Sequence, residues 1–393
     1  MKVTIYSERS RTMKLAKRLD HFQEYFFSSL AKKKAEVEKL TGKKVLDLSI
    51  GSPDFPPSPI YINKLKEFFD EKNSHIYPGY GAISEFTQGL QNWYKKRFNV
   101  NLEKDELFPL LGGKDGVSHL ALALLDAGDE VLVPDPGYPA FSGPATLIGA
   151  IPVYYNLTEA NNFRIDFEEL KKKISEKTRF IWVNFPANPT GQIADINDLK
   201  QIVDFVKENN IWLVYDNAYS EITFDGYIAP SILQIKGVKD VAVEIGSFSK
   251  TFSFAGYRMG WIVGNKKIIS ALAKVKSQFD SGLSRPLQKL GAYALDHADT
   301  QWQKKMIISY EKRRNIIIEN LKKIGLNAVK TKGSLYLWVK IPDSFNNSQE
   351  FSFDLLEKKQ ILLTPGTAFG KNGLRYVRVS ISSNIDNIDS YFN

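Results

Sequence analysis

One short segment near the middle of the chain carries residues that could do covalent chemistry. It runs from Ser247 to Arg258 and places Lys250 among small and hydroxyl-bearing residues. Apolar stretches precede and follow it, at 241–245 and 259–263, which predicts a buried strand on each side. Lysine is rarely buried without a reason, and a desolvated lysine amine is the nucleophile that forms imines with aldehydes. A lysine on a solvated loop between two strands is the competing interpretation.

A glycine pair opens a predicted helix further upstream. Gly112 and Gly113 would expose the backbone N–H groups of a helix N-terminus, which suit a phosphate. The segment is not a Walker A loop, because Phe108 stands where that motif needs its first glycine and Asp115 follows Lys114 in place of Ser or Thr. No G-x-G-x-x-G follows a strand, which argues against a nicotinamide dinucleotide. A purely structural helix start is the alternative.

Three other predicted strands end in residues that would suit an aromatic cofactor. Tyr138, in a proline-rich turn after a strand, could stack its ring on a flat ligand. Asn188 lies in a loop whose prolines and glycine would hold its amide in place. Asp216 ends a very apolar strand, where a carboxylate costs free energy unless good hydrogen-bond donors or a cation, such as a protonated pyridine nitrogen, meet it. Ordinary turns, and a helix cap at Asp216, are the competing interpretations.

Composition narrows the class of protein. The 393 residues, 43% hydrophobic and 25% charged, are typical of a globular protein with more than one domain. The net charge of +9 is spread over many amphipathic segments, so we predict no nucleic-acid partner. Without cysteine, and with four scattered histidines, the sequence predicts no metal site. We find neither a membrane-spanning apolar run nor a secretory signal, so we predict a cytoplasmic enzyme without a membrane partner.

Strands alternate with helices between about residues 106 and 265. The apolar runs lie at 131–133, 151–155, 179–183, 211–215 and 241–245. The helices are expected at 115–126, 196–209 and 266–279. This alternation predicts an α/β fold with a mainly parallel sheet between helices. Ligands of such sheets bind at the carboxyl ends of the strands, which is where these polar and aromatic residues fall.

The pattern changes after Pro286. The expected elements are one long helix at 287–324, a strand at 335–339, a helix at 351–359 and a strand at 376–381. We therefore expect an N-terminal arm (1–48) with a helix at 26–40, a large domain (49–285) and a small α+β domain (286–393). The arm is expected to pack on the small domain.

Taken together, the motifs resemble those of class I/II pyridoxal-phosphate-dependent aminotransferases of fold type I. In chain order they are Asn188-Pro189-Thr190-Gly191, Asp216-Asn217-Ala218-Tyr219 and Ser247-x-Ser249-Lys250 with Arg258. The resemblance extends over nearly the whole chain. It implies a large domain with a seven-stranded, mainly parallel sheet and a smaller α+β domain.

The resemblance also implies roles in binding pyridoxal 5′-phosphate. Lys250 would bind the cofactor covalently and then move a proton of the substrate. Asp216 would pair with the ring nitrogen, and Tyr138 would stack on the ring. Asn188 and Tyr219 would hydrogen-bond the ring oxygen. The phosphate would be held by Gly113, Lys114, Ser247, Ser249 and Arg258.

Further matches concern the substrate and a second subunit. Arg378 corresponds to the arginine that binds the substrate α-carboxylate, and Gly51 would line the same pocket. Tyr77 corresponds to a tyrosine that reaches the phosphate of the neighbouring subunit, which implies a homodimer with shared active sites. Tyr25 would match a tyrosine at the lip of the substrate site in the LL-diaminopimelate aminotransferase group.

That group is the closest one within the family, on segments 113–116, 216–222 and 276–282. The sequence departs from it at Asp115, Tyr257 and Thr87, where the group has glutamate, tryptophan and arginine. These departures leave the substrate open among diaminopimelate, aspartate, alanine, methionine and aromatic amino acids.

The implied activity is ping-pong transamination, from an L-amino acid to a 2-oxo acid by way of pyridoxamine phosphate. A C–S β-lyase on the same fold is the alternative, because local motifs separate the two reactions poorly. A cofactor-free binding protein is disfavoured because Lys250, Asp216 and Arg258 are all present.

Overall fold

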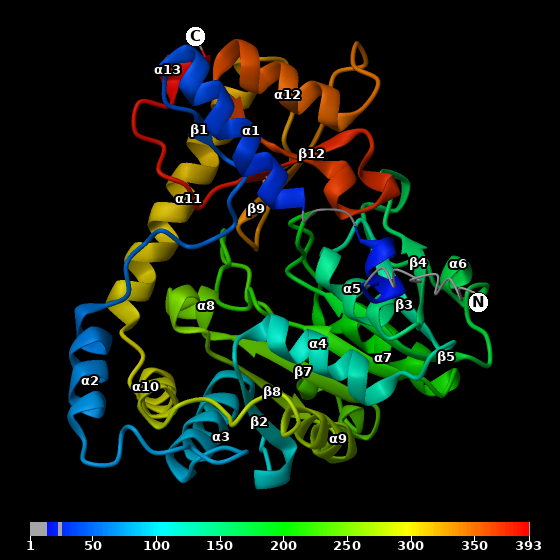
Figure 1. Cartoon of the computed structure of the whole chain (residues 1–393), viewed down its shortest axis with the longest axis vertical. Coiled ribbons are helices and arrows are strands. Elements are labelled where there is room, and N and C mark those ends of the chain that lie inside the picture. Colours follow the sequence, from blue (N-terminus) through cyan, green and yellow to red (C-terminus); the bar gives the residue numbers. More distant parts are fainter. Residues whose placement is uncertain (1–13, 23–25, 393) are drawn as a thin grey trace, which may run out of the picture.

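A seven-stranded sheet forms the centre of the computed structural model, which describes residues 14–22 and 26–392 (Figure 1). Its strands are β2 (Leu107–Leu110), β3 (Glu130–Asp135), β4 (Ile151–Asn156), β5 (Thr178–Asn184), β6 (Trp212–Asp216), β7 (Ala242–Ser247) and β8 (Gly260–Gly264). They lie in the order β2-β8-β7-β6-β5-β3-β4, and β8 alone runs antiparallel to its two neighbours. The predicted mainly parallel sheet of an α/β fold is confirmed.

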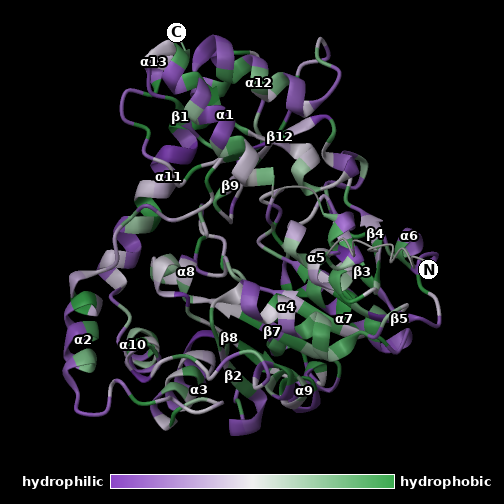
Figure 2. Ribbon diagram, in the orientation of Figure 1, coloured by the Kyte–Doolittle hydropathy of each residue, from purple (hydrophilic) through white to green (hydrophobic). Residues whose placement is uncertain are grey.

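Helices lie on both faces of this sheet and around it. They are α2 (Pro59–Asp70), α3 (Ser84–Phe98), α4 (Gly113–Leu124), α5 (Gly143–Leu147), α6 (Phe167–Lys171), α7 (Ile196–Glu208), α8 (Phe248–Thr251), α9 (Lys266–Lys276) and α10 (Arg285–Asp296). Helix α2 lies apart from the sheet and packs on α10 (Figure 1). Successive strand residues point to opposite faces, so Val131 and Val133 join one core cluster, with α4 and α9, while Leu132 joins the other. Hydrophobic residues accordingly gather at the sheet in Figure 2.

A second group of elements lies beyond the sheet, at the top of Figure 1. Its helices are α1 (Phe26–Thr41), α11 (Thr300–Lys323), α12 (Ser348–Lys359) and α13 (Asp389–Phe392). Its strands are β1 (Leu46–Asp47), β9 (Tyr336–Lys340), β10 (Ile361–Leu362), β11 (Thr364–Pro365) and β12 (Tyr376–Ser380). Strands β11, β12 and β9 form an antiparallel sheet, and β1 pairs with β10 in parallel. The N-terminal segment thus contributes a strand here, while the predicted domain boundaries stay a prediction.

Two expectations about the elements need correction. The single helix at 287–324 is wrong, because α10 and α11 are separate helices. Asp299 caps α11 by accepting a hydrogen bond from the Trp302 N–H, and Ser58 donates to the same carboxylate at 2.7 Å. Strand β2 was not expected; it contains Pro109 and lies at the sheet edge, where proline is tolerated. None of the described helices has the length and apolarity to cross a membrane.

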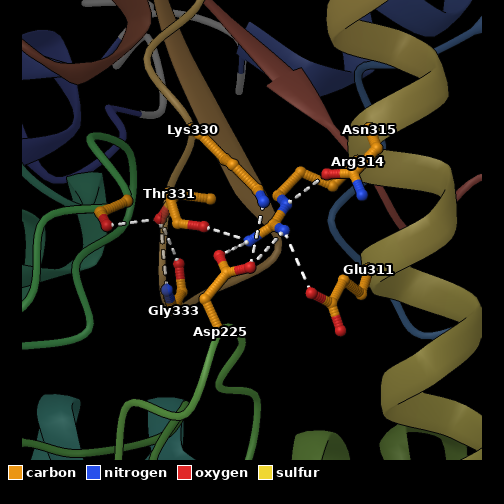
Figure 3. A network of polar contacts seen from close by, with 8 residues as sticks. Asp225, Glu311, Arg314, Asn315, Lys330, Thr331 and Gly333 are labelled. Carbon is orange, nitrogen blue, oxygen red and sulfur yellow. Dashed lines mark hydrogen bonds and ion pairs between the residues drawn. The ribbon is translucent and has the colours of Figure 1, made fainter.

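A buried arginine joins helix α11 to the loop after β6 and to the segment that leads into β9 (Figure 3). The Arg314 guanidinium makes a bidentate pair with Asp225, at 2.7 and 3.1 Å, and donates to the Thr331 carbonyl at 2.6 Å. The Thr331 hydroxyl lies 2.6 Å from the carbonyl oxygens of Gly191 and Gly333. These contacts hold the segment that leads into β9 against the loop that follows β5.

We expect Arg314→Met to destabilise the protein by about 2–3 kcal/mol, because it removes the buried partner of a carboxylate and a donor to a buried carbonyl. Arg314 holds the pKa of Asp225 below its ordinary value, so the pair's contribution is lost as the pH falls into the acidic range. Equilibrium urea denaturation measures the loss. Lys330→Met, which removes an exposed partner of the same carboxylate, should cost less than about 1 kcal/mol. Equal losses in the two variants would contradict a larger contribution from the buried arginine.

Candidate active site

The carboxyl ends of β3, β5, β6 and β7 face a cavity of about 520 Å³. The predicted residues in its lining are Gly51, Gly113, Lys114, Tyr138, Asn188, Asp216, Tyr219, Ser247, Ser249, Lys250, Arg258 and Arg378. Tyr77 is not in this lining, and Tyr25 lies outside the described residues. The structure therefore brings nearly all of the predicted site residues together, although they come from both ends of the chain.

Lys250 lies on α8, directly after β7. Ser247 begins this short helix by accepting a hydrogen bond from the Ser249 N–H at 3.2 Å. The Lys250 ammonium donates to the Gly51 carbonyl at 2.8 Å. Burial lowers the pKa of Lys250, and the positive charges of Arg378 and Arg258 act in the same direction. A larger share of the amine is therefore neutral and able to act as a nucleophile.

Asp216 is the last residue of β6, the strand next to β7. Its carboxylate accepts one hydrogen bond, from the Ala218 N–H at 3.2 Å, and the described residues form no ion pair with it. Burial raises the pKa of Asp216 to about 6. A cation brought into the cavity beside it would restore the charged carboxylate, as a protonated heterocyclic nitrogen would do.

Another part of the cavity lining is suited to an anion. Helix α4 begins after Gly112, which has φ of +90° and offers no capping side chain to the first N–H groups. A Cβ at Gly112 would lie 2.7 Å from Nη2 of Arg258, and one at Gly260 would lie 3.0 Å from the Gly113 nitrogen. Glycine at both positions lets the guanidinium and β8 approach the helix N-terminus closely. Such a pairing of N–H groups with a cation binds phosphate.

Arg378 comes from β12, the central strand of the antiparallel sheet. Its guanidinium donates to Asn188 Oδ1 at 3.0 Å and to the Ser49 carbonyl at 2.7 Å. It also lies over the rings of Tyr336 and Phe369, at 4.2 and 4.7 Å from their centroids. A planar, buried guanidinium held in this way is suited to bidentate binding of a carboxylate.

Tyr336 is the main residue that the motifs did not mark. It begins β9, and its hydroxyl lies 3.0 Å from the Tyr219 hydroxyl and 3.3 Å from the Gly51 carbonyl oxygen. A Cβ at Gly51 would overlap this hydroxyl, so glycine is required there. The strand was expected from its apolar residues, but its one hydroxyl-bearing side chain carried no local signal of a site. The lining also contains Ser52, Val117, Ala218 and Ala255, to which no role was assigned.

Asp115, a departure from the group's pattern, belongs to a buried ion cluster beneath the helix N-terminus. Lys276 lies 2.7 Å from both Asp115 and Asp280, and His119 lies 2.9 Å from Asp115. The same Asp115 carboxylate accepts the Leu111 N–H at 2.8 Å. The carboxylates thus have a cation within the chain, and the cluster ties the start of α4 to α9.

Comparison with known proteins identifies the family. The sequence pattern of aminotransferase class I and II matches residues 43–390, which is most of the chain. The chain belongs to this family. The predicted family and enzyme class are therefore confirmed.

Several relatives of this aminotransferase are similar over almost their full length. LL-diaminopimelate aminotransferase from Dehalococcoides mccartyi is 36% identical over 371 residues, 94% of this chain and 95% of that protein. The enzyme of the same name from Aquifex aeolicus is 39% identical over 368 residues, 93% and 94% of the two chains.

Solved structures agree with the fold. Apo-BacF from Bacillus subtilis superposes with a TM-score of 0.92 at 32% identity, covering 97% of each chain. An aminotransferase from Staphylococcus aureus gives a TM-score of 0.87 at 30% identity, covering 96% of this chain and 97% of that one. The predicted fold type I architecture is confirmed.

Family membership also confirms pyridoxal 5′-phosphate as the cofactor. The cavity fits its separate chemical groups. A half-buried carboxylate at Asp216 suits the ring nitrogen, the α4 N-terminus with Arg258 suits the phosphate, and the half-buried Lys250 amine suits the aldehyde. All of these groups line one cavity, as the binding of a single ligand with a ring nitrogen, a phosphate and an aldehyde requires.

We expect Asp216→Asn to stabilise the cofactor-free protein while weakening cofactor binding. The folded-state pKa of about 6 lies above the ordinary value near 4, so the charged carboxylate destabilises the fold at higher pH. The variant should be more stable by about 2–3 kcal/mol near pH 8, and the difference should vanish as the pH falls towards about 4. Urea denaturation of the apoprotein across this pH range measures it. The exposed control Asp204→Asn should show no such pH dependence; a pH-independent effect of Asp216→Asn would refute burial of the charged carboxylate as its cause.

Proposed function

We propose that this aminotransferase transfers the amino group of LL-diaminopimelate to 2-oxoglutarate. The observation that carries the reaction is the single cavity in which Lys250, Asp216 and Arg378 meet. The substrate is supported by the relatives named LL-diaminopimelate aminotransferase, 36–39% identical over nearly the whole chain. The roles of the individual site residues belong to the same proposal.

The residues around the cavity would hold the cofactor at several points. When bound, pyridoxal 5′-phosphate supplies an electron sink for the carbanion formed at the substrate Cα. Asp216, at the end of β6, would keep the ring nitrogen protonated. Tyr138 would stack on the ring, and Asn188 and Tyr219 would hydrogen-bond the ring oxygen. The phosphate group would be bound by Gly113, Lys114, Ser247, Ser249 and Arg258, all of which line the cavity.

Lys250 and Arg378 would act on the substrate. Arg378 binds the α-carboxylate through its fork of N–H groups and so orients the Cα–H bond. The Lys250 amine holds the cofactor before the substrate arrives. Because burial and two nearby arginines lower its pKa, a larger share of the released amine would be neutral and able to take the Cα proton. The same amine would then pass this proton to the carbon that carried the cofactor's aldehyde, and hydrolysis would release the 2-oxo acid and leave the amino group on the cofactor.

We expect the purified protein to form glutamate from 2-oxoglutarate only when LL-diaminopimelate or a related donor is present. Borohydride should fix the cofactor to the peptide that contains Lys250, as mass spectrometry would show. Lys250→Ala should abolish this link and lower turnover by at least ~10³-fold, because it removes both the nucleophile and the proton carrier. The exposed Lys274→Ala is the matched control and should keep both.

Two outcomes would overturn parts of this proposal. A wild-type protein that stays colourless with added pyridoxal 5′-phosphate would contradict the cofactor site. Pyruvate release from cystathionine without a 2-oxo acid would instead identify the protein as a C–S β-lyase. Aspartate, alanine, methionine and aromatic donors belong in the same assay, because a faster donor among them would replace diaminopimelate in the proposal.

We further propose a homodimer whose two active sites are shared. Tyr77 is 79% exposed, and its neighbours Ile76 and Tyr80 are exposed as well. An exposed apolar and aromatic loop suits burial against a second copy of the chain. Tyr77 would then reach the phosphate bound by the partner. A cytoplasmic location stays a prediction.

Mixing two inactive variants tests the shared sites. We expect Lys250→Ala and Tyr77→Ala homodimers, unfolded and refolded together, to give more activity than the mean of the two parents. A mixed dimer contains one site with Lys250 from one chain and Tyr77 from the other, so that site is intact. If Tyr77 served its own chain, no mixed dimer would contain an intact site and the activity would stay at the mean. Analytical ultracentrifugation of each parent checks that both are dimers.

A further inference from the structure

Tyr336 lies at the junction of the two sheets and faces the cavity next to Tyr219. Both side chains are buried, at 2% and 6% exposure, and their hydroxyl oxygens are 3.0 Å apart. The rings meet edge to face, with centroids 5.7 Å apart. Tyr219 comes from the loop after β6, whereas Tyr336 comes from β9. The pair is therefore a contact across the two parts of the fold.

The backbone holds this pair in place from both sides. The Ser334 N–H donates to the Ile222 carbonyl at 3.0 Å, and the Phe224 N–H donates to the Lys332 carbonyl at 2.9 Å. These hydrogen bonds join the segment just before Tyr336 to the segment just after Tyr219. The Arg314 network of Figure 3 fixes the same segment through the Thr331 carbonyl. The two hydroxyls are thus held in register by the backbone of their own segments.

The number of hydroxyl protons determines which of the two tyrosines donates the hydrogen bond between them. Each phenol has one proton to donate, and Tyr219 cannot donate to Tyr336 and to a bound ligand at once. Tyr336 has two acceptors within reach, Tyr219 at 3.0 Å and the Gly51 carbonyl at 3.3 Å. The Gly51 carbonyl already accepts from Lys250 at 2.8 Å. The shorter contact, to an acceptor without this competing donor, favours donation from Tyr336 to Tyr219.

We propose that Tyr336 is a positioning residue of the transamination reaction, which donates to Tyr219 and so turns the Tyr219 proton into the cavity. The inference rests on the proposed function, in which Tyr219 donates to the ring oxygen of the cofactor. A hydroxyl that accepts a hydrogen bond is also a stronger donor to its own acceptor. Tyr336 thereby increases the negative charge that Tyr219 can stabilise on the ring oxygen.

The Tyr336 ring has a second contact that an experiment can separate from the hydroxyl. The Arg378 guanidinium lies 4.2 Å from the ring centroid, so the ring supports the group that binds the substrate carboxylate. Tyr336→Phe removes the hydroxyl and keeps this ring. Tyr336→Leu removes both. The first change is expected to affect turnover, and the second is expected to raise the substrate KM in addition.

The experiment compares Tyr336→Phe, Tyr219→Phe and the double variant as holoenzymes. Tyr155→Phe is the matched control, because it removes another buried tyrosine hydroxyl, which donates to the Trp182 carbonyl away from the cavity. Spectroscopic titration gives the pKa of the cofactor–lysine link, which a donor to the ring oxygen lowers. Tyr336→Phe should raise this pKa, less than Tyr219→Phe does, and should lower kcat/KM by about three- to tenfold with little change in KM.

The double variant decides whether Tyr336 acts through Tyr219. We expect it to show the same pKa of the link as Tyr219→Phe, because without the Tyr219 hydroxyl nothing is left for Tyr336 to position. The inference would be overturned if the pKa shift of the double variant equalled the sum of the shifts of the two single variants. It would also be overturned if the link in Tyr336→Phe titrated like that in Tyr155→Phe. In both cases a wild type that binds cofactor and transaminates leaves the proposed function standing. A wild type that binds no pyridoxal 5′-phosphate would end both.

Discussion

The partial burial of charged side chains that form no ion pair with another described residue is the constraint on which this structure depends. Asp216 is a carboxylate whose pKa burial raises to about 6, and the charge of Lys250 offsets only part of this rise. Lys250 is an amine whose pKa falls for the same reason. Both conditions cost stability in the protein alone. A ligand with a cationic nitrogen would stabilise the charged Asp216 carboxylate, and a reactive carbonyl would use the neutral Lys250 amine.

The parallel sheet is what makes this arrangement possible. Strands β6 and β7 are neighbours that run in the same direction, so Asp216 and Ser247 end at the same edge of the sheet. Most other residues of the two strands are apolar and buried, with the buried Glu244 of β7 as an exception, and they fix both ends against a rigid core. Strand β8 then returns antiparallel and brings Gly260 against the N-terminus of α4. The sheet therefore places the Asp216 carboxylate, the lysine that follows β7 and the N-terminus of α4 around one cavity.

The sequence could predict the parts of the site that local patterns specify. Asp216, Asn188 and Lys250 each follow an apolar run, and a polar residue at a strand end is visible without knowing the fold. Tyr336 could not be recognised in this way, because its role depends on a contact with Tyr219, 117 positions earlier. The break between α10 and α11 involves one distant residue as well. Asp299 caps α11 locally by accepting the Trp302 N–H, while Ser58, far away in the sequence, donates to the same carboxylate.

Arg378 shows how the two sheets share one function. Its strand belongs to the small antiparallel sheet, while Asn188, which accepts one of its hydrogen bonds, follows β5 of the large one. A substrate carboxylate at this guanidinium would therefore bind both parts of the fold at once. The Tyr219–Tyr336 contact crosses the same junction, and the Arg314–Asp225 pair holds it together. Arg378 and the Tyr219–Tyr336 pair both lie at the junction of the two sheets. A shift of β9 and β12 relative to the large sheet would therefore weaken substrate binding and displace the hydrogen-bond partner of Tyr219 at the same time.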